Sequence, residues 1–257
     1  MLKRILTVAL VLVPSLAWAQ DVAVLNQVLE AVRTSYNKQE RPMVVLDLEG
    51  TLFDNRTRNL QILKEYGEQE LKAVRPAQAA LLANLMPPQM QYTTGDTLRG
   101  IGITEDAVIS NAAVFWAARF YTDDYLKYDV PNPGAVNYVR SLYSAGARIV
   151  YLTGRDIQRQ LLGTVKALRD QGLPIGVQGS ELIMRPTLAT QDAIYKQQVM
   201  NYLRHYGKVV ATFDSEPANV NNFRRAFPDS ICVLFNTLRS PNAPPLQPNI
   251  VTISAFQ

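Results

Sequence analysis

Cysteine and histidine are almost absent from this chain of 257 residues, which has one of each. The single cysteine, Cys232, excludes an intrachain disulfide, and the apolar residues around it are typical of a buried strand. The single histidine, His205, excludes a histidine-cluster metal site. It also lacks the Arg-His-Gly setting of phosphatases with a histidine nucleophile, so catalytic chemistry has to come from other side chains.

The chain also lacks a strong charge of either sign. Its formal net charge is +4, and two of those positive charges are Lys3 and Arg4 at the N-terminus. After them the only adjacent basic pair is Arg224 and Arg225, which lies in a predicted helix among polar neighbours. A nucleic-acid site needs basic residues gathered on one surface, so we expect no nucleic-acid partner.

A long apolar run occurs at the N-terminus, where residues 5–16 follow the two basic residues and precede Ala17-Trp18-Ala19. This order is typical of a secretory signal peptide over residues 1–19. The alternative is an uncleaved membrane anchor, but the run is shorter than the roughly 20 residues of a spanning helix, and Pro14 interrupts it. We therefore expect export to a bacterial periplasm or exterior, without a lipid anchor and with no membrane contact after cleavage.

Apolar, strand-like runs then alternate with helical patterns along the chain. This alternation predicts an α/β fold, a three-layer Rossmann-like sheet that is mainly parallel, with helices on both faces. An amphipathic helix is expected over residues 22–36. The expected strands are Met43–Leu46, Arg148–Leu152, Val209–Phe213, Ile231–Phe235 and Ile250–Ile253.

One interval is too long for a simple crossover between parallel strands. About a hundred residues separate the first two strands, whereas a helical crossover needs roughly a dozen. We therefore predict a core domain of residues 20–55 and 131–257, with residues 56–130 forming an inserted, mostly helical cap. Residues 86–103 carry several prolines and glycines and are left unassigned. Aromatic residues of the insertion such as Trp116 are expected in its own core rather than facing a substrate.

The chemical signal lies at the strand ends. Asp47 and Glu49 follow the first apolar strand and precede a Gly-Thr turn, and their spacing directs both side chains to the same side. Thr153 follows the second strand, and Asp214 ends a later one. Because the crevice beyond the carboxyl ends of parallel strands is the usual site of chemistry, these residues are expected to meet there.

Asp47-x-Glu49, Thr153, Lys196 and Asp214, in that order, resemble the four motifs of the haloacid dehalogenase superfamily. The resemblance extends over most of the chain after the signal segment and includes Pro131-Asn132-Pro133-Gly134-Ala135 opening a helix. The largest branch of that superfamily consists of phosphatases that form an aspartyl-phosphate.

The resemblance implies a role for each motif residue. Asp47 would be the nucleophile, and Glu49 would protonate the leaving group and then activate water. Thr153 and Lys196 would bind the transferring phosphoryl group. Mg²⁺ would be held by the carboxylates of Asp47 and Asp214 and by the backbone carbonyl of Glu49.

Two motifs depart from the common pattern. Most phosphatases of the superfamily have aspartate where this chain has Glu49, although Asp-x-Glu-Gly-Thr also occurs in the enolase-phosphatase branch. The fourth motif has Glu216 and Asn219 where many members have a second aspartate, and a role of either in metal binding is left open. Arg155 is expected either to contact a second anionic group of the substrate or to pair with a neighbouring acid.

These observations favour an exported, Mg²⁺-dependent phosphatase that acts on small-molecule phosphomonoesters. The alternative is a catalytically inactive relative that binds a phosphorylated ligand or a partner protein. Phosphotransfer to an acceptor other than water would use the same residues. The sequence predicts neither the natural substrate nor the oligomeric state.

Overall fold

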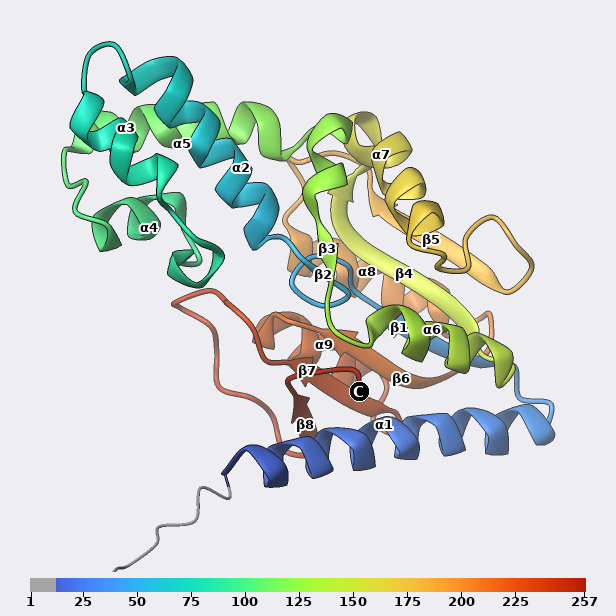
Figure 1. Cartoon of the computed structure of the whole chain (residues 1–257). Coiled ribbons are helices and arrows are strands. Elements are labelled where there is room, and N and C mark those ends of the chain that lie inside the picture. The colour runs from blue at the N-terminus through green and yellow to red at the C-terminus, as the bar shows by residue number, and fades with distance from the viewer. Residues whose placement is uncertain (1–12) are drawn as a thin grey trace, which may run out of the picture.

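The computed structural model describes residues 13–257, with the first helix running along one side of the molecule (Figure 1). Helix α1 spans Val13–Asn37, so the predicted helix over 22–36 begins earlier than expected. Most of the predicted signal segment, residues 1–12, lies outside the described residues. Within the described part of the chain, no helix combines the length and the apolar character needed to cross a membrane.

Six parallel strands form the central sheet in the order β5-β4-β1-β6-β7-β8. The five predicted strands are all present, and one further strand, at the sheet edge, was missed. That strand, β5, is half-buried and has no long apolar run, so its sequence carries little signal. The strands are β1 Pro42–Leu46, β4 Arg148–Asp156, β5 Ser180–Arg185, β6 Lys208–Asp214, β7 Ile231–Phe235 and β8 Ile250–Ile253.

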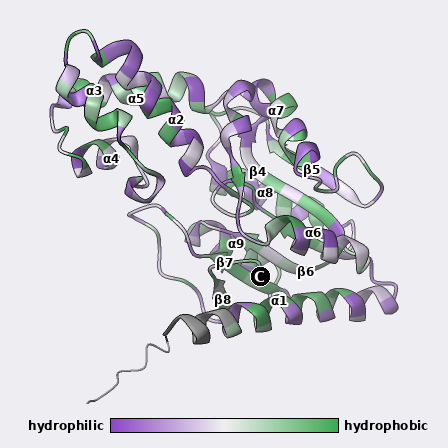
Figure 2. Ribbon diagram, viewed as in Figure 1, coloured by the Kyte–Doolittle hydropathy of each residue, from purple (hydrophilic) through white to green (hydrophobic). Residues whose placement is uncertain are grey.

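Helices cover both faces of this sheet, which confirms the predicted α/β class. Alternate residues of β1 point to opposite faces: Val44 and Leu46 join the core beneath α1 and α6, whereas Met43 and Val45 join the core beneath α8 and α9. Figure 2 shows the hydrophobic residues concentrated on the strands and on the inner sides of these helices. The remaining helices of the core are α6 Ala135–Ser144, α7 Ile157–Asp170, α8 Asp192–Leu203 and α9 Pro217–Ala226.

Between β1 and β4 the chain leaves the sheet and forms a group of helices, which we call the helical segment, residues 56–128 (Figure 1). It has its own apolar core, which includes Leu63, Leu82, Leu98 and Val108. Two short antiparallel strands, β2 and β3, pair where the chain leaves and returns. The elements are β2 Phe53–Asp54, α2 Arg56–Tyr66, η1 Gly67–Leu71, α3 Pro76–Ala83, η2 Pro87–Gln89, α4 Thr94–Gly100, α5 Asp106–Phe120, η3 Asp123–Tyr128 and β3 Val130–Pro131.

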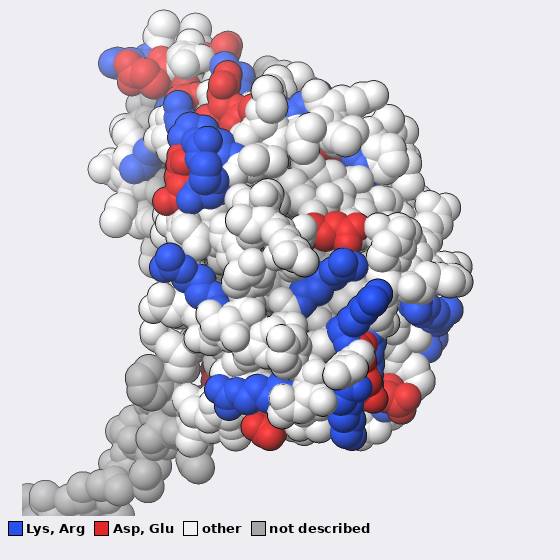
Figure 3. Space-filling model, turned by 90° about the vertical axis from the view of Figure 1, so that its right-hand side faces the viewer, with Lys and Arg blue, Asp and Glu red and all other residues white. Residues whose placement is uncertain are grey.

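Surface charge and the lone cysteine agree with the composition. On the face shown in Figure 3, basic and acidic side chains lie near one another rather than in a large field of one sign. Cys232 is buried in β7, as its apolar neighbours predict.

Candidate active site

The site lies at the carboxyl ends of three neighbouring strands. Because β1 lies between β4 and β6, Asp47 follows β1 directly beside Asp214 at the end of β6. The backbone N–H of Asp47 donates to the carbonyl of Phe213 at 2.9 Å, which fixes the nucleophile candidate against the next strand. The parallel topology therefore brings together acids that are far apart in the sequence.

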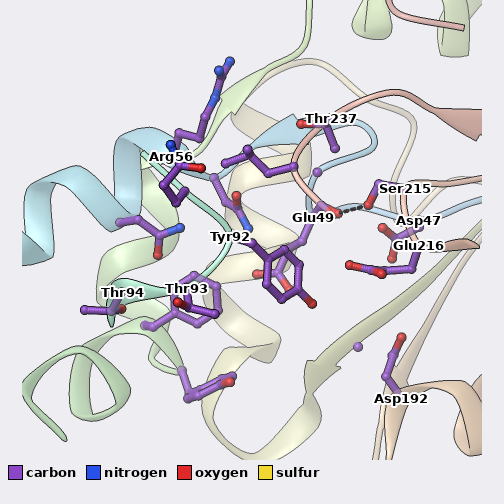
Figure 4. Close-up of a pocket in the computed structure, with 18 of the residues that line it drawn as sticks. Asp47, Glu49, Arg56, Tyr92, Thr93, Thr94, Asp192, Ser215, Glu216 and Thr237 are labelled. Atoms are coloured by element: carbon purple, nitrogen blue, oxygen red, sulfur yellow. Dashed lines mark hydrogen bonds between the residues drawn. The ribbon is translucent and has the colours of Figure 1, made fainter. Parts of the chain in front are cut away.

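A tight turn after β1 keeps the backbone close to the end of β6. Gly50 has a φ of 74°, and a Cβ added there would lie 2.8 Å from the hydroxyl oxygen of Ser215. The Ser215 hydroxyl in turn donates to the backbone carbonyl of Glu49 at 3.2 Å (Figure 4). Glycine thus allows a left-handed turn and a close approach that another residue would obstruct.

Lys196 lies at the centre of the carboxylates. Its ammonium donates to Asp47 Oδ1 and to Asp214 Oδ2, each at 2.8 Å, and the lysine is only 2% exposed. The hydroxyl of Thr51 donates to the other carboxylate oxygen of Asp47 at 3.0 Å. Three of the predicted site residues, Asp47, Lys196 and Asp214, therefore share one buried cluster.

Two further residues belong to this cluster, and one of them, Asp192, was missed in the sequence. Asp192 lies one helical turn before Lys196, with 3.5 Å between its Oδ2 and the ammonium. Asn219 donates from its amide to Asp192 at 3.0 Å and to Asp214 at 3.2 Å, which links the two acids. The spacing of an acid four residues before a lysine was the available signal for Asp192. Asn219 was noted in the fourth motif, where a role in metal binding was left open.

Asp192 also explains why a glycine is present at position 154. Gly154 lies near the end of β4, and a Cβ added there would lie 2.5 Å from Asp192 Oδ1, so any larger residue would force the Asp192 side chain to move. Thr153, one residue earlier, is fully buried, and its hydroxyl accepts from the backbone N–H of Arg155 at 3.2 Å. Gly154, but not Thr153, is among the cavity-lining residues.

The electrostatics reflect one cation among three acids. Burial, together with the charges of Asp214 and Asp192, raises the pKa of Asp47 to about 8 against the opposing effect of Lys196. Burial also raises the pKa of Asp214. For Lys196, burial acts to lower the pKa, but the three carboxylates raise it well above its ordinary value. The cluster carries more negative charge than its lysine compensates.

A divalent cation suits this donor set. The carboxylates of Asp47 and Asp214 and the carbonyl of Glu49 are hard oxygen ligands of the kind Mg²⁺ prefers, and the uncompensated negative charge favours a cation. Such a set contains only two carboxylates. Across residues 13–257, no group of three or more His, Cys, Asp or Glu side chains is arranged to hold a metal ion.

Glu49 lies in a second ion cluster beside the first. Its carboxylate pairs with Arg58 from helix α2 and lies 3.5 Å from Nε of Arg155. The same two arginines flank Asp129, with Nε of Arg58 at 2.9 Å and Nη2 of Arg155 at 2.7 Å from its carboxylate oxygens. Of the two expected roles of Arg155, the pairing with neighbouring acids is therefore observed.

This second cluster sets the charge of Glu49. Burial alone would raise the pKa of Glu49, but the guanidinium groups of Arg58 and Arg155 hold it below its ordinary value. Burial raises the pKa of Asp129 to about 6 in spite of the same two arginines. Glu49 is thus held as a carboxylate, in a position fixed by Arg58 from helix α2 and Arg155 from strand β4.

A cavity of about 570 Å³ lies between the helical segment and the carboxyl ends of the strands. Its core side carries Asp47, Lys196, Asp214 and Glu216, and its other side is formed by residues of α2, α4 and α5 and of the loop before α4. Figure 4 shows Tyr92 reaching from the helical segment toward the side where Glu216 and Asp192 lie. Trp116 lines this cavity, so the expectation that it belongs only to the segment's own core was wrong.

Comparisons with known proteins identify the fold. No protein-family model and no curated protein sequence matches this chain. A candidate phosphatase from Clostridium difficile is 14% identical with a TM-score of 0.52, over 83% of this chain and 94% of that one. A haloacid dehalogenase-like hydrolase from Streptococcus pneumoniae is 12% identical with a TM-score of 0.51, over 84% and 94% of the two chains. The chain therefore has the Rossmann-like α/β fold of haloacid dehalogenase-like hydrolases.

Proposed function

We propose that this protein is a Mg²⁺-dependent phosphomonoesterase that works through an aspartyl-phosphate on Asp47. The observation that carries the proposal is the buried ammonium of Lys196 held at 2.8 Å from both Asp47 and Asp214, at the floor of a cavity. A cation in this place would reduce the repulsion between an anionic nucleophile and an anionic phosphate. The phosphatase and hydrolase descriptions of the proteins that share the fold agree with this reading.

The first step transfers the phosphoryl group to the enzyme. A carboxylate oxygen of Asp47 attacks phosphorus, the bond to the leaving oxygen breaks, and that oxygen takes a proton from Glu49. The hydroxyl of Thr51 holds one oxygen of the Asp47 carboxylate at 3.0 Å and so limits its rotation. The resemblance assigns Thr153 to the phosphoryl oxygens, and because its hydroxyl is buried outside the cavity lining and accepts from the N–H of Arg155, this contact would require the hydroxyl to turn toward the cavity.

The second step releases phosphate. Glu49 accepts a proton from water, the water oxygen attacks phosphorus, and the carboxylate of Asp47 leaves. Arg58 and Arg155 hold the Glu49 carboxylate in the ionised form that this step needs. A Mg²⁺ ion bound by the carboxylates of Asp47 and Asp214 and the carbonyl of Glu49 would supply charge neutralisation for the transferred group.

The location of the substrate is also part of the proposal. A signal peptide over residues 1–19 would place the enzyme in a bacterial periplasm or outside the cell, where it would act on small phosphorylated metabolites. The helical segment would serve as a cap that closes the cavity over the substrate, since it forms one wall of the site.

One observation favours the alternative, a catalytically inactive protein that binds a phosphorylated ligand. The Glu49 carboxylate is already paired with Arg58 and close to Arg155, and its pKa is lowered, so it is a weak proton donor. With an alcohol as the leaving group, the first step would therefore use the small fraction of molecules in which Glu49 is protonated. Activity measurements on esters with different leaving groups separate the two functions.

The test is hydrolysis of a panel of small phosphomonoesters with Mg²⁺ and with a chelator. We expect phosphate release that requires the metal and that Asp47→Asn abolishes. Asp170→Asn is the matched control, because Asp170 pairs with Lys166 on the surface at the end of α7 and touches none of the site residues. If folded, Mg²⁺-loaded wild-type protein releases no phosphate from any ester, the binding function replaces the proposed one.

A further inference from the structure

The cavity has two chemically different walls. The core wall carries the acids and Lys196, whereas the wall from the helical segment carries four aromatic side chains. These are Tyr92 from the loop before α4, and Trp116, Phe120 and Tyr121 from α5 and its end. A phosphate on the core wall would thus direct the rest of the molecule toward aromatic rings.

Trp116 is held in a fixed orientation on that wall. Its indole N–H donates to Oδ1 of Asn59 at 2.7 Å, and its ring stacks on Phe120 with 4.4 Å between centroids. Tyr121 meets it edge-on at 5.5 Å. With its polar atom satisfied and one face supported, the half-buried Trp116 presents a preorganised apolar surface to the cavity.

Phe120 itself is not available to a ligand. Trp116 covers one side of its ring, and the guanidinium of Arg58 lies 3.8 Å from its centroid. It is also buried, with 7% of its surface exposed. Phe120 therefore supports Trp116, and the rings open to the cavity are Trp116, Tyr121 and Tyr92.

The basic side chains of the cavity differ in how far they are already paired. Arg56 lines the aromatic side, but its guanidinium is bound to Asp54 at 2.6 to 3.0 Å. Arg185 donates from Nη1 to the carbonyl of Thr190 at 2.9 Å, whereas its buried Nε has no hydrogen-bond partner. Among the described lining residues, five are acids and three are cations, and one bound Mg²⁺ would neutralise this excess of negative charge, so the aromatic wall rather than net charge would distinguish substrates.

We propose that the natural substrate is a phosphomonoester whose alcohol portion carries a planar aromatic ring, and that Trp116 is the residue that selects it. This inference rests on the proposed function, since it assumes that the phosphate occupies the core wall. The cavity of about 570 Å³ lies within the range that small-molecule ligands occupy. The ring would stack on Trp116, with Tyr121 and Tyr92 beside it.

The test compares benzyl phosphate with cyclohexylmethyl phosphate. The two esters have the same charge, nearly the same size and similar primary-alcohol leaving groups, and they differ mainly in the flatness of the ring. Wild-type protein should prefer the aromatic ester in kcat/KM by roughly 3- to 10-fold, mostly through KM. Trp116→Leu should bring the ratio close to one, whereas Trp116→Phe should retain most of the preference.

A matched control is Phe115→Leu, which removes the neighbouring ring of α5. Phe115 packs against Tyr66 and Arg119 and does not line this cavity, so its loss should leave the preference intact. Equal kcat/KM for the two esters in wild-type protein, or a preference that survives in Trp116→Leu, overturns the inference.

A binding measurement keeps this test independent of turnover. The chain has two tryptophans, Trp18 and Trp116, so a full-length Trp18→Phe, Asp47→Asn variant has Trp116 as its only fluorophore of this type. Benzylphosphonate should quench its fluorescence at a lower concentration than cyclohexylmethylphosphonate. Selective binding without hydrolysis of any ester would refute the phosphatase and support the aromatic specificity. Hydrolysis of the esters without ring selectivity in either assay would support the phosphatase and refute the aromatic specificity.

Discussion

Replacing Arg58 by methionine should strongly destabilise the protein. Arg58 is completely buried, pairs with Glu49 and Asp129 at once and donates to the carbonyl of Phe120 at 3.0 Å. The cluster of Arg58, Arg155, Asp129 and Glu49 is electrically neutral as it stands. Methionine fills similar space but leaves one buried negative charge uncompensated, and breaking a buried pair in this way costs about 3 to 5 kcal/mol.

A double variant tests whether the lost charge is the cause. Asp129→Leu alone leaves one excess positive charge, whereas Arg58→Met with Asp129→Leu leaves Arg155 paired with Glu49 and restores neutrality. The double variant should therefore lose clearly less stability than the sum of the two single variants. Urea unfolding at about pH 7.5, where Asp129 is ionised because its pKa lies near 6, gives the three free-energy differences.

The pH dependence gives a second check on the same perturbation. Asp129 has a folded-state pKa above its ordinary value, so it becomes protonated in the folded protein as the pH falls below about 6. Arg58 lowers this pKa, so in Arg58→Met Asp129 takes up its proton at a higher pH, and the destabilisation should shrink as the pH falls toward about 6. The role of the buried charge would be refuted if the single variants lost less than about 1 kcal/mol of unfolding free energy. It would also be refuted if the effects of the two substitutions were strictly additive in the double variant.

Three further predictions concern the site itself. In steady-state kinetics, Glu49→Gln should lower kcat by roughly 10²- to 10⁴-fold with little change in KM, because it removes the general acid and base without removing phosphate contacts. A change in KM alone would contradict the role of Glu49 as acid and base. Gly154→Ala should displace Asp192 and lower the melting temperature of the protein. Gly100→Ala is the control, because an added Cβ there meets nothing within 4 Å and should leave the melting temperature unchanged. Equal melting temperatures of the two variants would contradict the predicted clash. The affinity for Mg²⁺, measured by calorimetry, should fall by up to about 10-fold per pH unit from pH 8 to 6, because the raised pKa of Asp47 lets protons compete with the metal. In Asp47→Asn this pH dependence of the affinity should be largely lost. The same pH dependence in both proteins would refute the prediction.

The sequence predicted the core of the site because the parallel sheet assembles it. Apolar runs located the ends of β1 and β6, although they ended β4 at Leu152 instead of Asp156, and strand ends in one parallel sheet share an edge. Asp47 and Asp214 could therefore be placed together, and the order of the motifs added Lys196. The structure confirms that these three residues are in contact.

Side chains that meet through tertiary packing could not be predicted in the same way. Arg58 and Asp129 lie far apart along the chain. They meet because β2, just before α2, pairs with β3, which directly follows Asp129. Trp116 has the spacing of a core residue in an amphipathic helix, and its spacing cannot show that the helix edge faces a cavity. Strand β5 was missed because an edge strand that is only half-buried needs no continuous apolar run.

The central claim is that Asp47 carries the phosphoryl group during turnover. The most direct measurement is rapid acid quench of the Mg²⁺-loaded protein with excess benzyl phosphate, followed by mass spectrometry of the peptide that contains Asp47. We expect a phosphate on that carboxylate which appears within the first turnover and is absent from Asp47→Asn. Full turnover without phosphate on Asp47, together with retained activity in Asp47→Asn, would contradict it.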